Sequence, residues 1–171
     1  FEDESGCWRM LTYFDNVYPT LTSVNMTGSM ITSDSKKAPT SWEDNSTNRA
    51  STFAAVGDKL GFQVYFSENI KDTNGMKAVL SIKDADGNPI KLDIQRVSGN
   101  CITFKDFTVT EGMQCVGRIL ITSFENAGNV CDLAGNKVTT NMTSSIKSPN
   151  QQIFLDRDKP FISTSAVATD G

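Results

Sequence analysis

The tract Gly57-Asp58-Lys59-Leu60-Gly61-Phe62-Gln63-Val64-Tyr65-Phe66-Ser67-Glu68-Asn69-Ile70 decides the fold. Its apolar side chains recur at every second position, at Leu60, Phe62, Val64 and Phe66. Successive side chains of a β-strand point to opposite faces of a sheet, so a period of two predicts a strand with one buried face. The tract therefore predicts a core strand over residues 60–66.

The same period of two lies on both sides of a turn further along the chain. It occupies residues 78–82, stops at the turn-rich residues 84–89 and resumes at residues 90–94. Asp-Gly and Gly-Asn pairs tolerate positive φ, and they are typical of the turn that joins two antiparallel strands. These residues therefore predict a β-hairpin.

More short apolar segments follow, and they complete the pattern of an all-β protein. A change of parity between Phe104 and Phe107 predicts a β-bulge, and residues 138–146 are expected to form a polar edge strand. No stretch shows helical periodicity over three turns. Short strands with turns about every 8 to 12 residues predict an antiparallel β-sandwich of about seven strands.

The chain also repeats part of itself. Residues 13–23 and 154–164 share the spacing of an aromatic residue, an aspartate and a proline, with Pro160 in the place of Pro19. A self-match at the length of a domain predicts one complete module within a tandem array. We expect a tail of a preceding repeat or a linker in residues 1–12, the module in residues 13–155, and the start of the next repeat in residues 156–171.

Charge and composition exclude several classes of function. The net charge is −4 over 171 residues, and the lysines and arginines are scattered, so we expect no nucleic-acid binding. No apolar run approaches the roughly 20 residues of a membrane span, so we expect no membrane insertion of this fragment. Histidine is absent, which removes the common nucleophilic triads and imidazole acid–base chemistry. We therefore expect a protein that is not an enzyme.

Two motifs resemble bacterial Ig-like domains. Residues 57–70 are similar to the strand of that family that ends in Phe-Ser-Glu, and residues 132–138 are similar to its Asp-Leu-Ala-Gly-Asn turn. The tracts Asp15 to Pro19 and Asp156 to Pro160 resemble the start of such a domain. The resemblance covers roughly residues 13–155 and implies an immunoglobulin-like β-sandwich. It also implies an extracellular, cell-surface location, neighbouring repeats as partners and no catalytic residues.

The turn motif also has a physical interpretation. The Asp132 carboxylate can accept backbone N–H groups within the turn, while Gly135 and Asn136 tolerate left-handed geometry. We expect Leu133 and Val138 to insert into the core.

A calcium site is the first hypothesis about a ligand. In an Ig-like sandwich the start of the domain, the loop after the second strand and the loop before the last strand share one end. Asp15, Glu68 and Asp132 would then lie close together, and carboxylate oxygens are the ligands that Ca²⁺ prefers. Asp156 and Asp158 would serve the next junction. The alternative is that these residues cap turns or are solvated charges, in which case the module needs no cofactor.

The cysteines form a second open question. An even number in a secreted-looking chain suggests one or two disulfides. The candidates are Cys7, Cys101, Cys115 and Cys131. We favour a Cys101–Cys131 pair because both residues should lie at the same end of the sandwich. The other pairings, and free buried thiols, stay open.

Two functions remain. The chain is a non-catalytic stalk, spacer or adhesion unit of a tandem-repeat surface protein. Alternatively, it binds a host glycan or protein through the polar residues 33–49, with Trp42 as the contact residue.

Overall fold

The computed structural model describes residues 14–29, 51–138 and 152–155. The described part is all-β, as the sequence predicts, apart from one short 3-10 turn, η2 (Ala127–Asn129). The strands are β1 (Leu21–Ser29), β2 (Ser51–Ala54), β3 (Lys59–Phe66), β4 (Ile70–Asp72), β5 (Lys77–Lys83), β6 (Pro89–Ser98), β7 (Cys101–Phe104), β8 (Phe107–Thr108), β9 (Ile121–Glu125), β10 (Cys131–Asp132) and β11 (Gln152–Leu155).

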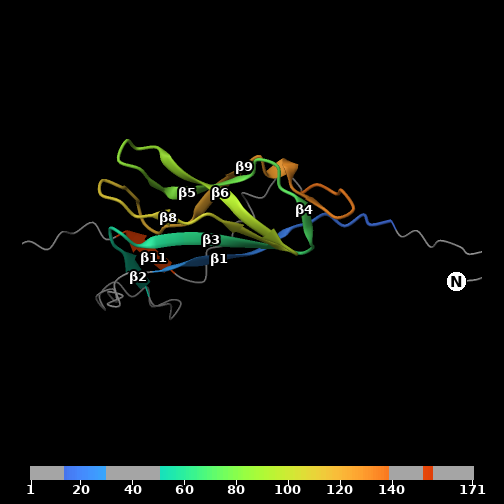
Figure 1. Cartoon of the computed structure of the whole chain (residues 1–171), viewed down its shortest axis with the longest axis horizontal. Helices are drawn as coiled ribbons and strands as arrows, with labels where there is room; N and C mark the ends of the chain where they lie inside the picture. Colours follow the sequence, from blue (N-terminus) through green and yellow to red (C-terminus); the bar gives the residue numbers. More distant parts are fainter. Residues whose placement is uncertain (1–13, 30–50, 139–151, 156–171) are drawn as a thin grey trace, which may run out of the picture.

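Most of these strands belong to one curled antiparallel sheet. Its order is β1-β3-β7-β6-β5-β9, and β8 also pairs with β3 (Figure 1). The curl runs through β6, because residues 89–93 pair with β5 whereas residues 94–98 pair with β7. The register shifts between Ile94 and Arg96. The predicted hairpin is confirmed as β5 and β6. β7 ends at Phe104 and β8 begins at Phe107, so the strand is interrupted where the sequence predicts a β-bulge.

Two small pairs of strands complete the architecture. β10 pairs with β4 in antiparallel fashion, and β11 pairs with β2 in parallel fashion. The predicted antiparallel pairing is confirmed for the main sheet and for β4 with β10, whereas β2 and β11 depart from it. Period-two alternation gives no direction of pairing, so the sequence pattern had no signal for this pair. Of the predicted edge strand at residues 138–146, only Val138 is described; residues 139–146 lie outside the described residues.

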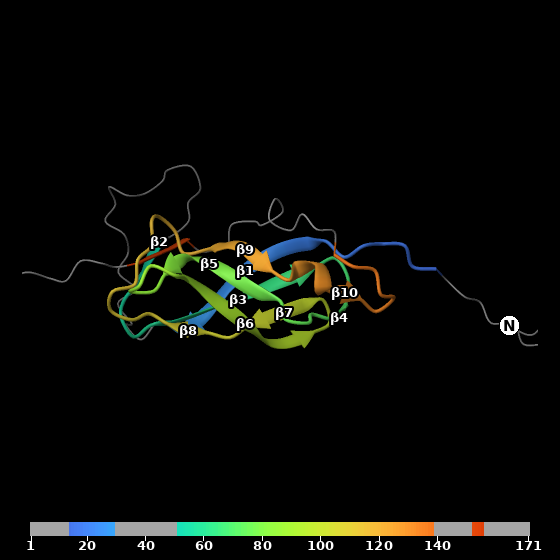
Figure 2. The same ribbon diagram turned by 90° about the horizontal axis from the view of Figure 1, so that it is seen from above.

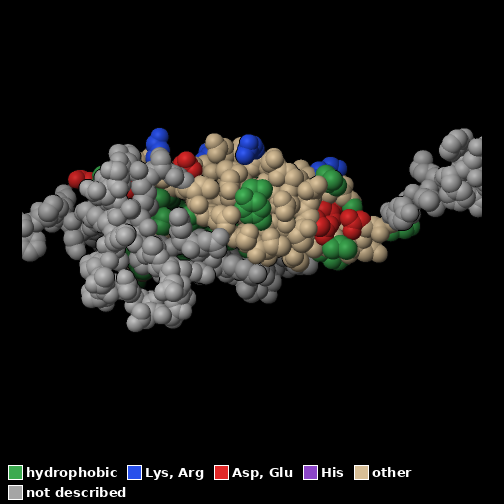
Figure 3. Space-filling model, turned by 90° about the horizontal axis from the view of Figure 1, so that it is seen from below, with side chains coloured by type: hydrophobic (Ala, Val, Ile, Leu, Met, Phe, Trp, Pro, Cys, Tyr) green, Lys and Arg blue, Asp and Glu red, His purple; other side chains and the backbone are tan. Residues whose placement is uncertain are grey.

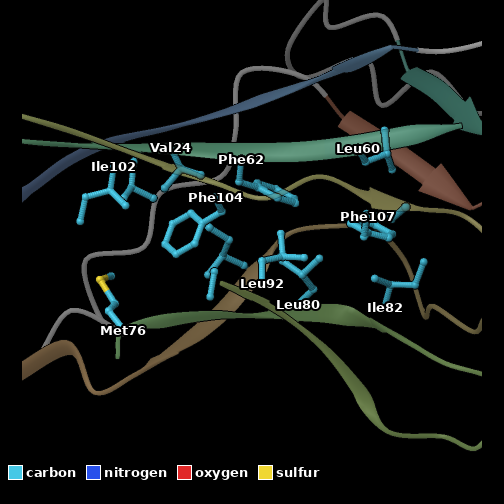
Figure 4. Close-up of a cluster of buried hydrophobic side chains, with 14 of the residues drawn as sticks. Val24, Leu60, Phe62, Met76, Leu80, Ile82, Leu92, Ile102, Phe104 and Phe107 are labelled. Carbon is cyan, nitrogen blue, oxygen red and sulfur yellow. The ribbon is translucent and has the colours of Figure 1, made fainter. Parts of the chain in front are cut away.

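The two halves of the curled sheet pack their alternating apolar side chains against each other. Figure 4 shows Val24, Leu60 and Phe62 on one side of this core and Leu80 and Ile82 on the other. Phe62, Val64 and Phe104 are fully buried or nearly so, and the Phe104 ring stacks on that of Phe124 with centroids 6.2 Å apart. The alternation on β3 thus forms the central layer of the core.

The strand β3 also separates two ends of the molecule. Its eight residues span about 25 Å. The segments near Phe66, the last residue of β3, form what we call the N-terminal pole. It consists of residues 14–20, 67–69 and 132–137. The residues around its first position form the C-terminal pole, made of residues 55–58 and 115–118 together with the end of β11. Figures 1 and 2 show the start of the described chain at one end, with β4 and β10, and β2 at the other.

The predicted module boundaries fall at the margins of this structure. Residues 1–12 and 156–171 lie outside the described residues, so the division at these points stays a prediction. Within the described ranges, no helix is long and apolar enough to cross a membrane.

Replacing the central core residue should destabilise the whole fold. We expect Phe62→Ala to lower the free energy of unfolding by about 3–5 kcal/mol, because it removes a fully buried aromatic side chain and leaves a cavity. Urea denaturation followed by circular dichroism measures this change. The matched control is Gln95→Ala on the exposed face of β6, which should change stability by less than about 0.5 kcal/mol.

Candidate functional site

Two sets of hydrogen bonds hold the leading segment, residues 14–20, against the other loops of the N-terminal pole, and one further bond lies within the segment. The Val17 N–H donates to Asp15 Oδ1 over 3.0 Å, which forms a local turn. The Thr20 N–H donates to Ser67 Oγ over 3.0 Å, and the Ser67 N–H donates to the Thr20 carbonyl over 2.9 Å. Asn136 Nδ2 donates to the Asp15 carbonyl over 2.9 Å. The start of the described chain is therefore held against two loops that are distant in sequence.

One of these loops is the Asp132 to Asn136 turn, whose predicted chemistry is present. The Asp132 carboxylate accepts from the Asn136 N–H over 2.8 Å and from Asn136 Nδ2 over 3.0 Å. Gly135 has φ +94°, a left-handed conformation that glycine adopts without strain. Val138 is buried as expected, but Leu133 is 65% exposed. The prediction that Leu133 inserts into the core is wrong, because the turn that buries the Asp132 side chain directs the next one outward.

The third contributor to this pole, Glu68, lies two residues after the end of β3. One carboxylate oxygen of Asp15, one of Glu68 and one of Asp132 all lie within 4.8 Å of one another. The structure thus brings together the three residues that the sequence proposed for a calcium site. Each comes from a different motif: the tract that starts the domain, the Phe-Ser-Glu strand and the Asp-Leu-Ala-Gly-Asn turn. We call this group the carboxylate cluster.

The electrostatics of the carboxylate cluster differ from one residue to the next. Burial, together with the charges of Asp15 and Asp132, raises the pKa of Glu68 above its ordinary value. Oxygen Oε1 of Glu68 is shielded from solvent and has no hydrogen-bond partner among the described residues. Burial also acts to raise the pKa of Asp132, but the hydrogen bonds from Asn136, Gly135 and Ala134 outweigh it and lower that pKa. The hydrogen bonds therefore favour the ionised form of Asp132, whereas the neighbouring negative charges disfavour the ionised form of Glu68.

Among the described residues, none of the ion pairs involves a member of the carboxylate cluster. Those ion pairs lie on the β5–β6–β9 face instead. They join Lys77 and Lys105 to Asp93, and Lys91 to Glu125. Three carboxylates that are close together and unpaired in this way offer the hard oxygen ligands that suit Ca²⁺. Their other use is structural, since the Asp132 carboxylate caps its own turn. The calcium prediction itself stays a prediction.

The predicted Cys101–Cys131 disulfide is wrong. Both residues are free thiols, and they lie in different sheets. Cys101 pairs opposite Tyr65 on β3, and its thiol hydrogen-bonds with the Tyr65 side chain, which raises the pKa of that tyrosine. Cys131 instead pairs with Asp72 on β4. A common end of the molecule brings two residues into the same region, but it does not direct their side chains toward each other.

The remaining candidates are either outside the described residues or have a structural role. The buried Cys115 thiol contacts Ser81 Oγ over 3.6 Å. Asp84, which lies in the turn of the β5–β6 hairpin and is not one of these candidates, accepts hydrogen bonds from the Asn88 and Asp86 N–H groups, and the bonds from Asn88 lower its pKa. The candidates outside the described residues are Cys7, Trp42 with the whole of residues 33–49, Asp156 and Asp158.

Sequence reasoning missed two features of the N-terminal pole. The exchange of hydrogen bonds between Thr20 and Ser67, and the contact from Asn136 to Asp15, had no signal because each joins residues far apart in sequence. The outward position of Phe14, Val17 and Tyr18 was also missed. A short apolar segment without period-two alternation is the only pattern that could have indicated it.

Comparison with known protein families, with curated proteins and with solved structures found no match.

Removing the Asn136 amide should loosen the leading segment. We expect Asn136→Ala to increase amide hydrogen exchange at Val17 and Thr20 by about tenfold or more, because the Asp15 carbonyl loses its donor. Exchange measured by NMR or mass spectrometry tests this. Asn129→Ala is the control, since it removes a similar bond, to the Asn74 carbonyl, from a different loop. Equal exchange rates at Val17 and Thr20 in the two variants would show that the Asn136 to Asp15 hydrogen bond does not hold the leading segment in place.

Neutralising Glu68 should stabilise the protein in the absence of divalent cations. A raised carboxyl pKa means that the folded state favours the protonated form, and this stability is lost as pH rises through that pKa. We therefore expect Glu68→Gln to melt at the same temperature as the parent near pH 4 or below and at a higher temperature near pH 7 in EGTA. Thermal melts across this range measure the difference. A variant that melts at a lower temperature at pH 7 would contradict the repulsion.

Proposed function

We propose that the chain is a non-catalytic, extracellular Ig-like module of a tandem-repeat surface protein, and that it acts as a stalk, spacer or adhesion unit whose N-terminal pole binds Ca²⁺. The observation that carries this proposal is the carboxylate cluster. Asp15, Glu68 and Asp132 converge where the domain begins, and each comes from a motif that resembles Ig-like repeats.

The architecture supports the module part of the proposal. A curled antiparallel sheet that encloses one apolar core is compatible with an Ig-like sandwich. The described chain starts at one pole and reaches the end of β11 at the other, which is the arrangement that extends an array (Figure 1). The self-match of residues 13–23 with 154–164 supports repetition of the same unit.

The chemistry of the pole supports a binding role over a catalytic one. The chain has no histidine, and the Asp132 carboxylate is engaged by its own turn. Three carboxylates near the start of a domain would let Ca²⁺ fix the angle between that domain and its neighbour. The shielded Oε1 of Glu68 gains a partner in this arrangement.

The alternative function, binding of a glycan or protein through residues 33–49, has no observation in its favour. That segment and Trp42 lie outside the described residues.

Thermal melting with Ca²⁺ and with EGTA tests the proposed function. At a Ca²⁺ concentration 100-fold above the dissociation constant, binding to the folded state adds about 2.7 kcal/mol, which corresponds to a rise of several degrees in melting temperature. We expect this rise in the parent chain and not in Glu68→Gln.

The control is Glu125→Gln on β9, which neutralises a carboxylate that lies outside the cluster. It should keep the full response to Ca²⁺. A response that is equal in all three proteins, or absent from the parent, would refute the calcium site.

A further inference from the structure

The described residues leave large hydrophobic side chains exposed at both poles. At the N-terminal pole, Phe14 is 87% exposed and Leu133 is 65% exposed, and Val17 and Tyr18 are exposed as well. These residues adjoin the carboxylate cluster, because their segments carry Asp15 and Asp132. Figure 3 shows acidic side chains with hydrophobic side chains on both sides at one end of the molecule. The pole therefore combines an acidic centre with an apolar rim.

The C-terminal pole exposes two further valines. Val116 is 95% exposed and Val56 is 60% exposed. Val56 follows β2, whose last residue pairs with Leu155. Val116 precedes Arg118, which forms a bridge with Phe154. Both valines thus flank the end of β11, where the described chain leaves the domain.

The repeat in the sequence places these two poles next to each other in an array. In the self-match Leu155 takes the place of Phe14, so the leading segment of a following module would begin where β11 ends. Residues 14–20 span at most about 25 Å when fully extended. In this structure they are held to the N-terminal pole by hydrogen bonds. A module joined in this register has its N-terminal pole close to the C-terminal pole of the module before it.

We propose that the N-terminal pole docks head to tail on the C-terminal pole of a like module. The rim residues Phe14, Val17, Tyr18 and Leu133 would pack on Val56 and Val116. This inference rests on the proposed function and specifies the partner of the same pole. Docking is favourable because it removes apolar surface on both poles from water. It also shields the acidic centre from solvent, so that a cation binds there more strongly.

The interface is heterologous, because it joins two different surfaces of identical modules. Linked modules reach an effective concentration in the millimolar range, so a weak contact is enough in an array. The same contact between separate copies of the 171-residue chain should therefore appear at about 1 mM. Sedimentation velocity in Ca²⁺ should show a sedimentation coefficient that rises with protein concentration.

Two double variants test the two poles one at a time without changing the net charge. Phe14→Ser with Leu133→Ser removes the two most exposed rim residues, and Val56→Ser with Val116→Ser removes their partner surface. We expect each double variant to stay monomeric alone and an equimolar mixture of the two to form a one-to-one dimer. The control, Gln95→Ser on β6, should associate as the parent does.

Each other outcome overturns the proposal. A parent that is monomeric at about 1 mM has no such interface. A Val56→Ser, Val116→Ser variant that still forms dimers would show an isologous contact between two N-terminal poles. A mixture that stays monomeric would show that the two poles do not fit each other.

The test also distinguishes this inference from the proposed function. A chain that melts at a higher temperature in Ca²⁺ but never associates would retain the calcium site and lose the docking surface. A chain that associates head to tail in both Ca²⁺ and EGTA, with no change in melting temperature, would retain the docking surface and lose the calcium site.

Discussion

The pairing of β3 along both edges is the constraint on which the rest of the structure depends. β3 bonds to β1 on one side and to β7 and β8 on the other, so most of its length lies between two paired neighbours. Its register is strongly specified, because a slip by one residue would turn Phe62 and Val64 toward solvent. The same strand sets the distance between the two poles and carries Glu68 to one of them.

The N-terminal pole shows how a stable sheet can hold an unfavourable arrangement of charge. Hydrogen bonds fix Asp132 in its turn and fix the leading segment beside it, which leaves Glu68 facing two other carboxylates. The raised pKa of Glu68 expresses that repulsion. A cation would turn the repulsion into attraction, and an apolar partner over the rim would exclude competing water. The calcium proposal thus follows from the gathering of like charges. The docking proposal follows from the exposed apolar residues around them.

The errors of sequence reasoning have specific causes. Leu133 was expected in the core because it is apolar, but the turn around Asp132 directs it outward. Cys101 and Cys131 were expected to pair because they share a pole, but one faces Tyr65 and the other belongs to the β4–β10 pair. In each case the residue type suggested a role, but it did not reveal the direction in which the side chain points. Direction depends on strand pairing and turn geometry, which a pattern of residue types does not contain.

By itself, the sequence determined the strand content, the buried face of β3, the β5–β6 hairpin and the capping chemistry of the Asp132 turn. These are local properties, because they depend on a period of two or on residues within four positions of each other. Only the tertiary structure decided the parallel pairing of β11 with β2, the contact of Asn136 with Asp15 and the outward position of the apolar rim. These depend on contacts between residues far apart in the chain, and their free energy is set by the packing of the whole sheet.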